Sequence, residues 1–131
     1  MRILVCEDQD SIRNMIMTLV KASGHDVIAV PSGAKAVELV LTERIDMLLL
    51  DLMMPGALDG FAVCERLRKE ESTKDVPIFI ISAMDDAASR QRALDAGATG
   101  FYGKPFRPLV LLQQIKEIAA QIAQKKADAG A

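Results

Sequence analysis

Four short, uninterrupted apolar runs, spaced through the first 81 residues, constrain the fold of this chain more than any other feature. They occupy residues 3–6, 27–30, 47–50 and 78–81. Strands of a parallel sheet that is covered on both faces have this pattern, because neither side of such a strand meets water. The stretches between the runs are long enough for helices. The alternation therefore predicts repeated β–α units.

The intervening stretches carry apolar residues at spacings of three and four, which is typical of amphipathic helices. The positions are Ile12, Met15, Ile16, Leu19, Val37, Val40, Leu41, Phe61, Cys64 and Leu67. The helix boundaries are indicated by N-cap residues, by a first-turn proline and by C-terminal glycines. We expect N-caps at Asp10, Ser32, Asp59 and Asp86, a helix start at Pro108, and C-terminal glycines at positions 24 and 97.

In the last third of the sequence, we expect a fifth strand at residues 99–103 and a final helix after it. The helix has a stripe at Leu111, Ile115, Ile118 and Ile122, while Leu109 and Val110 are expected to be partly exposed. Five β–α units in this length predict an α/β fold, a doubly wound five-stranded parallel sheet in the order 2-1-3-4-5 with helices on both faces. We expect one domain over residues 1–123 and a flexible tail or linker stub at 124–131.

Composition supports a single globular domain, with 131 residues, 50% of them hydrophobic and 26% charged. Sixteen basic and 18 acidic residues leave a net charge of -2, without the cationic surplus that binding to nucleic acid or a membrane usually requires. No apolar run is long enough to span a bilayer. We expect a soluble, cytoplasmic protein in which Cys6 and Cys64 are buried and reduced.

Polar side chains follow the predicted strands at the point where each strand ends. Glu7 and Asp8 follow the first run, Asp51 the third, Ser82 the fourth and Lys104 the fifth. Ligands of such sheets bind outside the carboxyl ends of the strands, so these five side chains are expected to converge.

Three carboxylates at one edge repel one another, by roughly 4 kcal/mol for two charges about 4 Å apart at an effective dielectric near 20. The repulsion is relieved by a raised carboxyl pKa, by pairing with Lys104, or by a hard divalent cation. Oxygen ligands without imidazole or thiolate favour Mg²⁺ over zinc. Mg²⁺ beside an ammonium and a hydroxyl suits phosphoryl transfer, with Asp51 as the candidate nucleophile.

With these motifs the sequence resembles the receiver domain of two-component response regulators, over nearly its whole length. The resemblance rests on ILVCED at residues 3–8, LLDLMMP at 49–55, DG at 59–60, ISA at 81–83 and KPF at 104–106. It implies that Asp51 is the phosphoacceptor, supplied by a histidine kinase or a histidine phosphotransfer protein. It also implies Mg²⁺ bound directly by Asp8 and Asp51, with Glu7 helping, often through water, and with the backbone carbonyl of Met53.

The resemblance further implies that Lys104 contacts the phosphoryl oxygens and that Ser82 swings toward them after transfer. Phe101 falls at the family's aromatic switch position, where tyrosine is usual, and the neighbouring Tyr102 remains an alternative. The loop at residues 55–60 is one residue longer than the family's commonest pattern. The helix after Ser82 has few large apolar residues, so we expect it to be lightly anchored.

The leading interpretation is thus a signalling switch that catalyses its own phosphorylation and dephosphorylation but turns over no metabolite. Its partner surface is expected on the fourth helix, fifth strand and fifth helix, for a downstream protein target or output domain, with phosphorylation-dependent homodimerisation as one outcome. The alternative is a phosphorylation-independent interaction module of the same fold, although neither the acids, the acceptor nor the lysine is lost. A flavin or nucleotide carrier would need a phosphate cradle where Glu7 and Asp8 stand. A magnesium phosphatase would need a second acid just after Asp51.

Overall fold

Five parallel strands form one sheet in the order β2-β1-β3-β4-β5 in the computed structural model, which describes residues 1–130. The strands are β1 (Arg2–Cys6), β2 (Asp26–Val30), β3 (Met47–Leu50), β4 (Ile78–Ser82) and β5 (Gly100–Gly103). The predicted fold class and strand order are confirmed.

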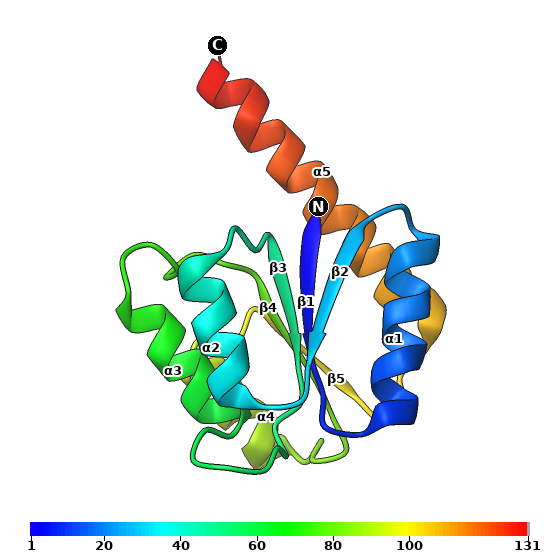
Figure 1. Cartoon of the computed structure of the whole chain (residues 1–131), viewed down its shortest axis with the longest axis vertical. Coiled ribbons are helices and arrows are strands. Elements are labelled where there is room, and N and C mark those ends of the chain that lie inside the picture. The colour runs from blue at the N-terminus through cyan, green and yellow to red at the C-terminus, as the bar shows by residue number, and fades with distance from the viewer. Residues whose placement is uncertain (131) are drawn as a thin grey trace.

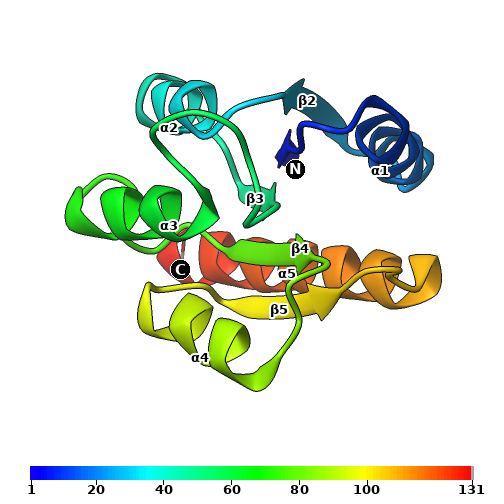
Figure 2. The same ribbon diagram turned by 90° about the horizontal axis from the view of Figure 1, so that it is seen from below.

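Five helices alternate with the strands and cover both faces of the sheet. They are α1 (Asp10–Ala22), α2 (Gly33–Thr42), α3 (Gly60–Lys69), α4 (Ala87–Asp95) and α5 (Pro108–Gly130). Helices α1 and α5 pack on one face, and α2, α3 and α4 on the other (Figures 1 and 2). In Figure 1, β1 runs downward from the N-terminus, so the carboxyl ends of the parallel strands lie at the lower edge.

Alternating strand residues divide the core into two layers. Ile3 and Val5 of β1 face α1 and α5, whereas Leu4 and Cys6 face the helices on the other side. All four are essentially inaccessible to solvent, as expected for a strand covered on both faces. Cys6 and Cys64 are both buried, as expected from the sequence, and neither takes part in a disulfide.

Three of the four expected N-caps are confirmed, since Ser32, Asp59 and Asp86 each accept a hydrogen bond from a backbone N–H three residues later. The prediction for Asp10 is wrong. Gln9 is the N-cap of α1 and provides no side-chain cap, and Asp10 is the first helical residue, where it pairs with Arg13. An acid in the first turn still interacts favourably with the helix dipole.

The apolar stripes are largely buried as expected. Phe61, Cys64 and Leu67 are buried in α3, and Leu111, Ile115 and Ile118 in α5. Leu109 and Val110 are exposed, in agreement with the sequence. Helix α1 departs from the expected stripe at two positions. Met15, which belongs to the expected stripe, is 46% exposed, and Val20, which does not, is fully buried.

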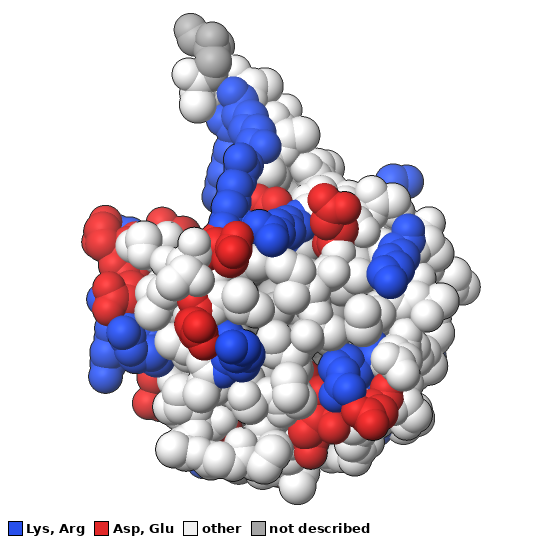
Figure 3. All heavy atoms as spheres, in the orientation of Figure 1, with Lys and Arg blue, Asp and Glu red and all other residues white. Residues whose placement is uncertain are grey.

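Helix α5 continues to Gly130, so residues 124–130 are helical rather than a separate tail, and Ala131 lies outside the described residues. The distal part of α5 projects beyond the amino edge of the sheet, and basic side chains run along one side of it (Figures 1 and 3). Elsewhere on the face in Figure 3, acidic and basic side chains are mixed. None of the described helices combines the length and hydropathy needed to cross a bilayer.

Candidate functional site

Three polar residues that directly follow strands continue the backbone hydrogen bonding of the sheet, which aligns them with one another. The Glu7 amide donates to Val30 O at 3.1 Å, the Asp51 amide to Cys6 O at 3.1 Å, and the Lys104 amide to Ser82 O at 2.9 Å. The carboxyl ends of β1, β3 and β5 therefore place Glu7, Asp51 and Lys104 at one edge of the sheet, as the sequence predicts.

Glu7, Asp8 and Asp51 form an acidic cluster, with one carboxylate oxygen from each lying within 4.8 Å of the others. Glu7 is 2% and Asp51 5% exposed, whereas Asp8 is exposed. Cys6 lies just before the cluster, but burial and the nearby acids raise the pKa of its thiol to about 12, so it stays protonated and is a poor metal ligand. The donors are thus carboxylate oxygens, which fit a hard divalent cation such as Mg²⁺.

Lys104 connects the two buried acids. Its Nζ lies 2.8 Å from Asp51 Oδ2 and 3.1 and 3.2 Å from the two carboxylate oxygens of Glu7. The Lys104 side chain is only 13% exposed, so these contacts are shielded from bulk water. One ammonium therefore contacts two carboxylates but offsets the charge of only one, so the cluster of three acids retains a negative charge when all of them are ionised.

The pKa values of the three groups reflect this arrangement. Burial, followed by the proximity of Asp51, raises the pKa of Glu7 to about 7, against the opposing effect of Lys104. Burial also acts to raise the pKa of Asp51, but the Glu7 carboxyl, the Lys104 ammonium and the Met53 amide together hold it below its usual value. Burial acts to lower the pKa of Lys104, but the two carboxylates outweigh it and raise that pKa. Of the two buried acids, Asp51 is therefore ionised near neutral pH, whereas Glu7 is partly protonated.

The loop after β3 fixes the Asp51 carboxylate from its own backbone. The Met53 amide donates to Asp51 Oδ1 at 3.1 Å, so each Asp51 oxygen has one donor. Gly60, at the start of α3, closes this loop through a hydrogen bond from its amide to Leu52 O. A Cβ at position 60 would lie 2.6 Å from both Asp51 O and Leu52 Cα, so only glycine allows this approach.

Ser82 is the last residue of β4 and is fully buried. Its Oγ accepts a hydrogen bond from the Met84 amide at 3.2 Å, which joins it to the β4–α4 loop. Phe101 and Tyr102 lie on opposite faces of β5: Phe101 packs toward the layer that contains α4, and Tyr102 toward α5, where its hydroxyl donates to Gln114 Oε1 at 2.8 Å. Of the two aromatic residues, Phe101 is thus the one that shares a layer with α4.

Sequence reasoning missed Arg13, on the first turn of α1. Its guanidinium donates to Glu7 O at 3.0 Å and to Asp8 O at 3.5 Å, and it pairs with Asp10. It therefore stabilises the backbone of the two acids without contacting their carboxylates. Nothing in the sequence distinguishes Arg13 from the other charged residues of the predicted helices.

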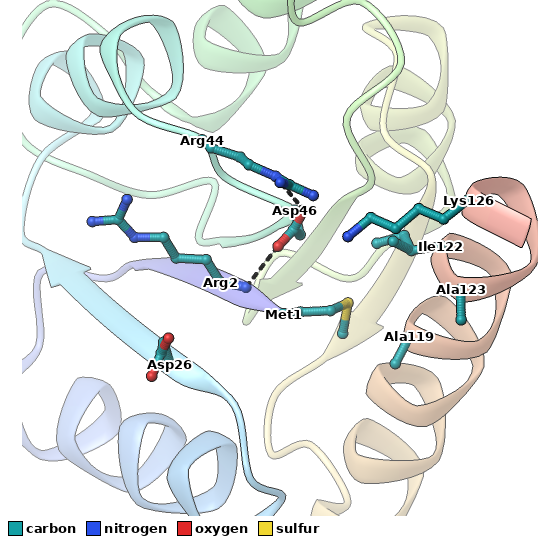
Figure 4. A pocket seen from close by; sticks show the side chains of 9 residues that line it. All are labelled: Met1, Arg2, Asp26, Arg44, Asp46, Ala119, Ile122, Ala123 and Lys126. Atoms are coloured by element: carbon teal, nitrogen blue, oxygen red, sulfur yellow. Dashed lines mark hydrogen bonds and ion pairs between the residues drawn. The ribbon is translucent and has the colours of Figure 1, made fainter. Parts of the chain in front are cut away.

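A cavity of about 490 Å³ lies at the opposite edge of the sheet, under the projecting part of α5 (Figure 4). Its acid Asp46 already accepts a hydrogen bond from the Arg2 amide at 2.8 Å and lies 3.6 Å from Arg44. Asp26 and Asp46 in this cavity belong to no cluster of metal-binding character among the described residues. The acidic edge is therefore the better candidate site.

Comparison with known proteins agrees with this geometry. The family model of the response regulator receiver domain matches residues 3–116. The chain belongs to this family, which defines it as a two-component response regulator receiver domain.

Among curated relatives, a probable transcriptional regulator, ycf27, from Porphyridium aerugineum is 38% identical over 92% of this chain and 49% of its own length. The chain spans about half the length of the curated relatives it matches.

Among solved structures, a putative response regulator from Chloroflexus aurantiacus has a TM-score of 0.85 at 30% identity, covering 91% of this chain and 97% of that one. The receiver domain of the Pseudomonas aeruginosa sensor histidine kinase PA1611, described with magnesium coordinated in its active-site cleft, has a TM-score of 0.83 at 28% identity over 90% and 97% of the two chains.

Proposed function

We propose that this receiver domain accepts a phosphoryl group on Asp51 from a histidine kinase or a histidine phosphotransfer protein. The observation that carries the proposal is the position of Asp51: a buried carboxylate, held anionic by Lys104 and the Met53 amide, inside an acidic cluster suited to a divalent cation. A carboxylate so placed can attack phosphorus, while the bond from phosphorus to the donor nitrogen breaks.

Mg²⁺ would be held by the carboxylates of Asp8 and Asp51 and by the Met53 carbonyl, with Glu7 acting through water. When bound, it offsets the charge that spreads over the phosphoryl oxygens during transfer. Lys104 Nζ is already 2.8 Å from Asp51 Oδ2. It is therefore close enough to contact an oxygen of a phosphoryl group bound to Asp51. The domain then chemically modifies itself and turns over no separate metabolite.

The surface formed by α4, β5 and α5 is the proposed output surface. Large apolar side chains are exposed there, with Leu94 at 47%, Leu109 at 80% and Val110 at 44%. Helix α4 buries only Ser89 and Ala93, so it is held more lightly than α5, as expected from the sequence. A near-dianionic phosphoryl group at Asp51 gives Ser82 a new partner, and the loop leading to α4 can follow it. A downstream protein, an output domain or a second copy of this chain would bind the altered surface.

The experiment is intact-protein mass spectrometry after incubation with acetyl phosphate, with and without Mg²⁺. We expect a gain of one phosphoryl group that requires Mg²⁺ and is absent in Asp51→Asn. Asp59→Asn serves as the matched control, because Asp59 is an acid of the same loop that caps α3 and lies outside the acidic cluster. No gain in folded wild-type protein would instead support a phosphorylation-independent interaction module.

A further inference from the structure

A cation lies over the aromatic ring at the proposed switch position. The guanidinium carbon of Arg90, on α4, is 4.8 Å from the centroid of the Phe101 ring on β5. Phenylalanine has no hydroxyl, so the ring cannot be held by a hydrogen bond from its own side chain. The contact between Arg90 and the ring is a cation–π contact, which holds the apolar Phe101 side chain by electrostatic attraction.

The same arginine is tied to the loop that follows Ser82. Arg90 Nε donates to the backbone oxygen of Asp85 at 2.9 Å. Asp85 is three residues beyond Ser82, whose Oγ accepts from the Met84 amide at 3.2 Å. One side chain thus contacts both the β4–α4 loop and the Phe101 ring, and a continuous path of contacts joins Ser82 Oγ to Phe101.

The surroundings of Arg90 leave room for a second arrangement of this side chain. A cavity of about 380 Å³ adjoins it and is lined also by Asp85, Lys104 and Arg107. The cavity gives the guanidinium room to leave the ring, and the Asp85 carboxylate in its lining offsets part of the repulsion from the two other cations. Because α4 buries few side chains, a shift of the loop meets little resistance from packing.

We propose that Arg90 is a positioning residue that couples Ser82 to Phe101 and takes the place of the missing aromatic hydroxyl. The inference rests on the proposed function. In the arrangement described here, Ser82 Oγ is bound by the Met84 amide and Arg90 covers Phe101. When Ser82 turns toward a phosphoryl group on Asp51, the Met84 amide loses its acceptor and the β4–α4 loop moves with Asp85 O. Arg90 then leaves the ring, and Phe101 is free to change rotamer.

This coupling is reciprocal, so it can be measured at the phosphorylation site. If the Arg90–Phe101 contact stabilises the arrangement that must be left, its removal makes activation easier. We expect Arg90→Ala to bind beryllofluoride, a stable mimic of the phosphoryl group, about two- to fivefold more tightly in the presence of Mg²⁺. That factor corresponds to the loss of a cation–π contact at a partly exposed site. Arg90→Lys keeps the charge but not the planar group, so its shift should be smaller.

Arg92 provides a matched control on the same helix. Its guanidinium carbon lies 4.0 Å from the centroid of the Phe61 ring, so Arg92→Ala removes a cation–π contact of the same kind that does not involve Phe101. We expect its beryllofluoride affinity to equal that of wild type. A double-mutant cycle completes the design, because the effect of Arg90→Ala should vanish in a Phe101→Leu background.

The ring itself can be followed by fluorine NMR of protein labelled with 4-fluorophenylalanine, which reports on the four phenylalanines of the chain. The Phe101 resonance, assigned with Phe101→Leu, should change with beryllofluoride in wild type and change by less than half as much in Arg90→Ala.

Unchanged affinity in Arg90→Ala, an equal effect of Arg92→Ala, or additivity with Phe101→Leu would each overturn the inference. Failure of wild type to bind beryllofluoride with Mg²⁺ would overturn the proposed function itself, and is thereby distinguishable. Circular dichroism of each variant verifies that it is folded.

Discussion

Lys104 Nζ lies 2.8 Å from Asp51 Oδ2 and also contacts both carboxylate oxygens of Glu7. Two of the three ways of relieving the charge repulsion expected from the sequence are therefore present together: pairing with the lysine and a raised pKa at Glu7. The third, a divalent cation, would compete with the proton on Glu7 and with Lys104 for the same oxygens.

The raised pKa of Glu7 predicts how stability depends on pH. Between its usual pKa of 4.5 and about 7, the native state holds a proton that the unfolded chain has lost. In the presence of EDTA, the free energy of unfolding should fall as the pH rises through this window, by at most about 1.4 kcal/mol per pH unit from this group, and level off above it. Below pH 4.5 both states are protonated and Glu7 contributes no slope.

Urea unfolding followed by circular dichroism at several pH values checks this prediction. Glu7→Gln removes the titrating group and should abolish the decline. The same decline in Glu7→Gln would show that another group is responsible.

Substitution of Gly60 by alanine should disturb the site from the backbone. Its Cβ would meet Asp51 O and Leu52 Cα at 2.6 Å, and backbone atoms yield only by moving the loop. We expect Gly60→Ala to lower the free energy of unfolding by about 1–3 kcal/mol and to slow phosphorylation by acetyl phosphate. Asp59→Ala is the control, because loss of the α3 cap costs about 1 kcal/mol but leaves the Asp51 loop in place. Equal phosphorylation rates in the two variants would contradict the assignment.

Arg68 should be a main determinant of stability away from the acidic site. Its guanidinium donates to the backbone oxygens of Gly97 at 2.8 Å, Lys74 at 3.0 Å and Val76 at 2.6 Å, so it joins the loops that precede β4 and β5. Arg68→Met keeps the apolar stem but leaves these carbonyls without their donor, and should cost about 2–4 kcal/mol. Arg66→Met removes only an exposed pair with Glu70 and should stay within about 0.5 kcal/mol of wild type.

The phosphoryl group on Asp51 should be long-lived, because Met53, two residues after Asp51, and Met84, two residues after Ser82, are apolar and cannot orient an attacking water. Met53 is 56% exposed, so a polar residue can be placed there without loss of core packing. We expect Met53→Asn with Met84→Asn to shorten the half-life of the phosphorylated protein severalfold, measured by intact mass after removal of the donor. The same positions changed to leucine should leave the half-life unaltered. A half-life in wild type equal to that of the polar variant would contradict the explanation.

The sequence predicts the centre of the sheet well because β1, β3 and β4 are buried on both faces, which gives continuous apolar runs with few alternatives, whereas the edge strands β2 and β5 are only partly buried. The strand topology also predicts the site, because the carboxyl ends of parallel strands bring Glu7, Asp51 and Lys104 to one edge of the sheet. The expected N-cap at Asp10 was wrong because a capping acid and a first-turn acid look alike in sequence, and only the backbone of Gln9 distinguishes them. Helicity beyond residue 123 was missed because the apolar stripe ends there, although alanine and lysine keep high helix propensity.

Contacts between long side chains were beyond prediction. Arg13 and Arg90 each read as one more charged residue on a helix surface, and their partners are a carbonyl pair in one case and an aromatic ring in the other. Such contacts depend on side-chain rotamers and on loop conformation, and neither of these leaves a periodic pattern in the sequence.

The most direct test of the central claim is to locate the modified residue chemically. Borohydride reduces an aspartyl phosphate to homoserine, so protein treated with acetyl phosphate and Mg²⁺, reduced and digested, reports the acceptor by peptide mass. We predict homoserine at position 51 and nowhere else, and none without Mg²⁺. Homoserine at another aspartate, or none in folded protein that has been exposed to donor and Mg²⁺, would contradict the account.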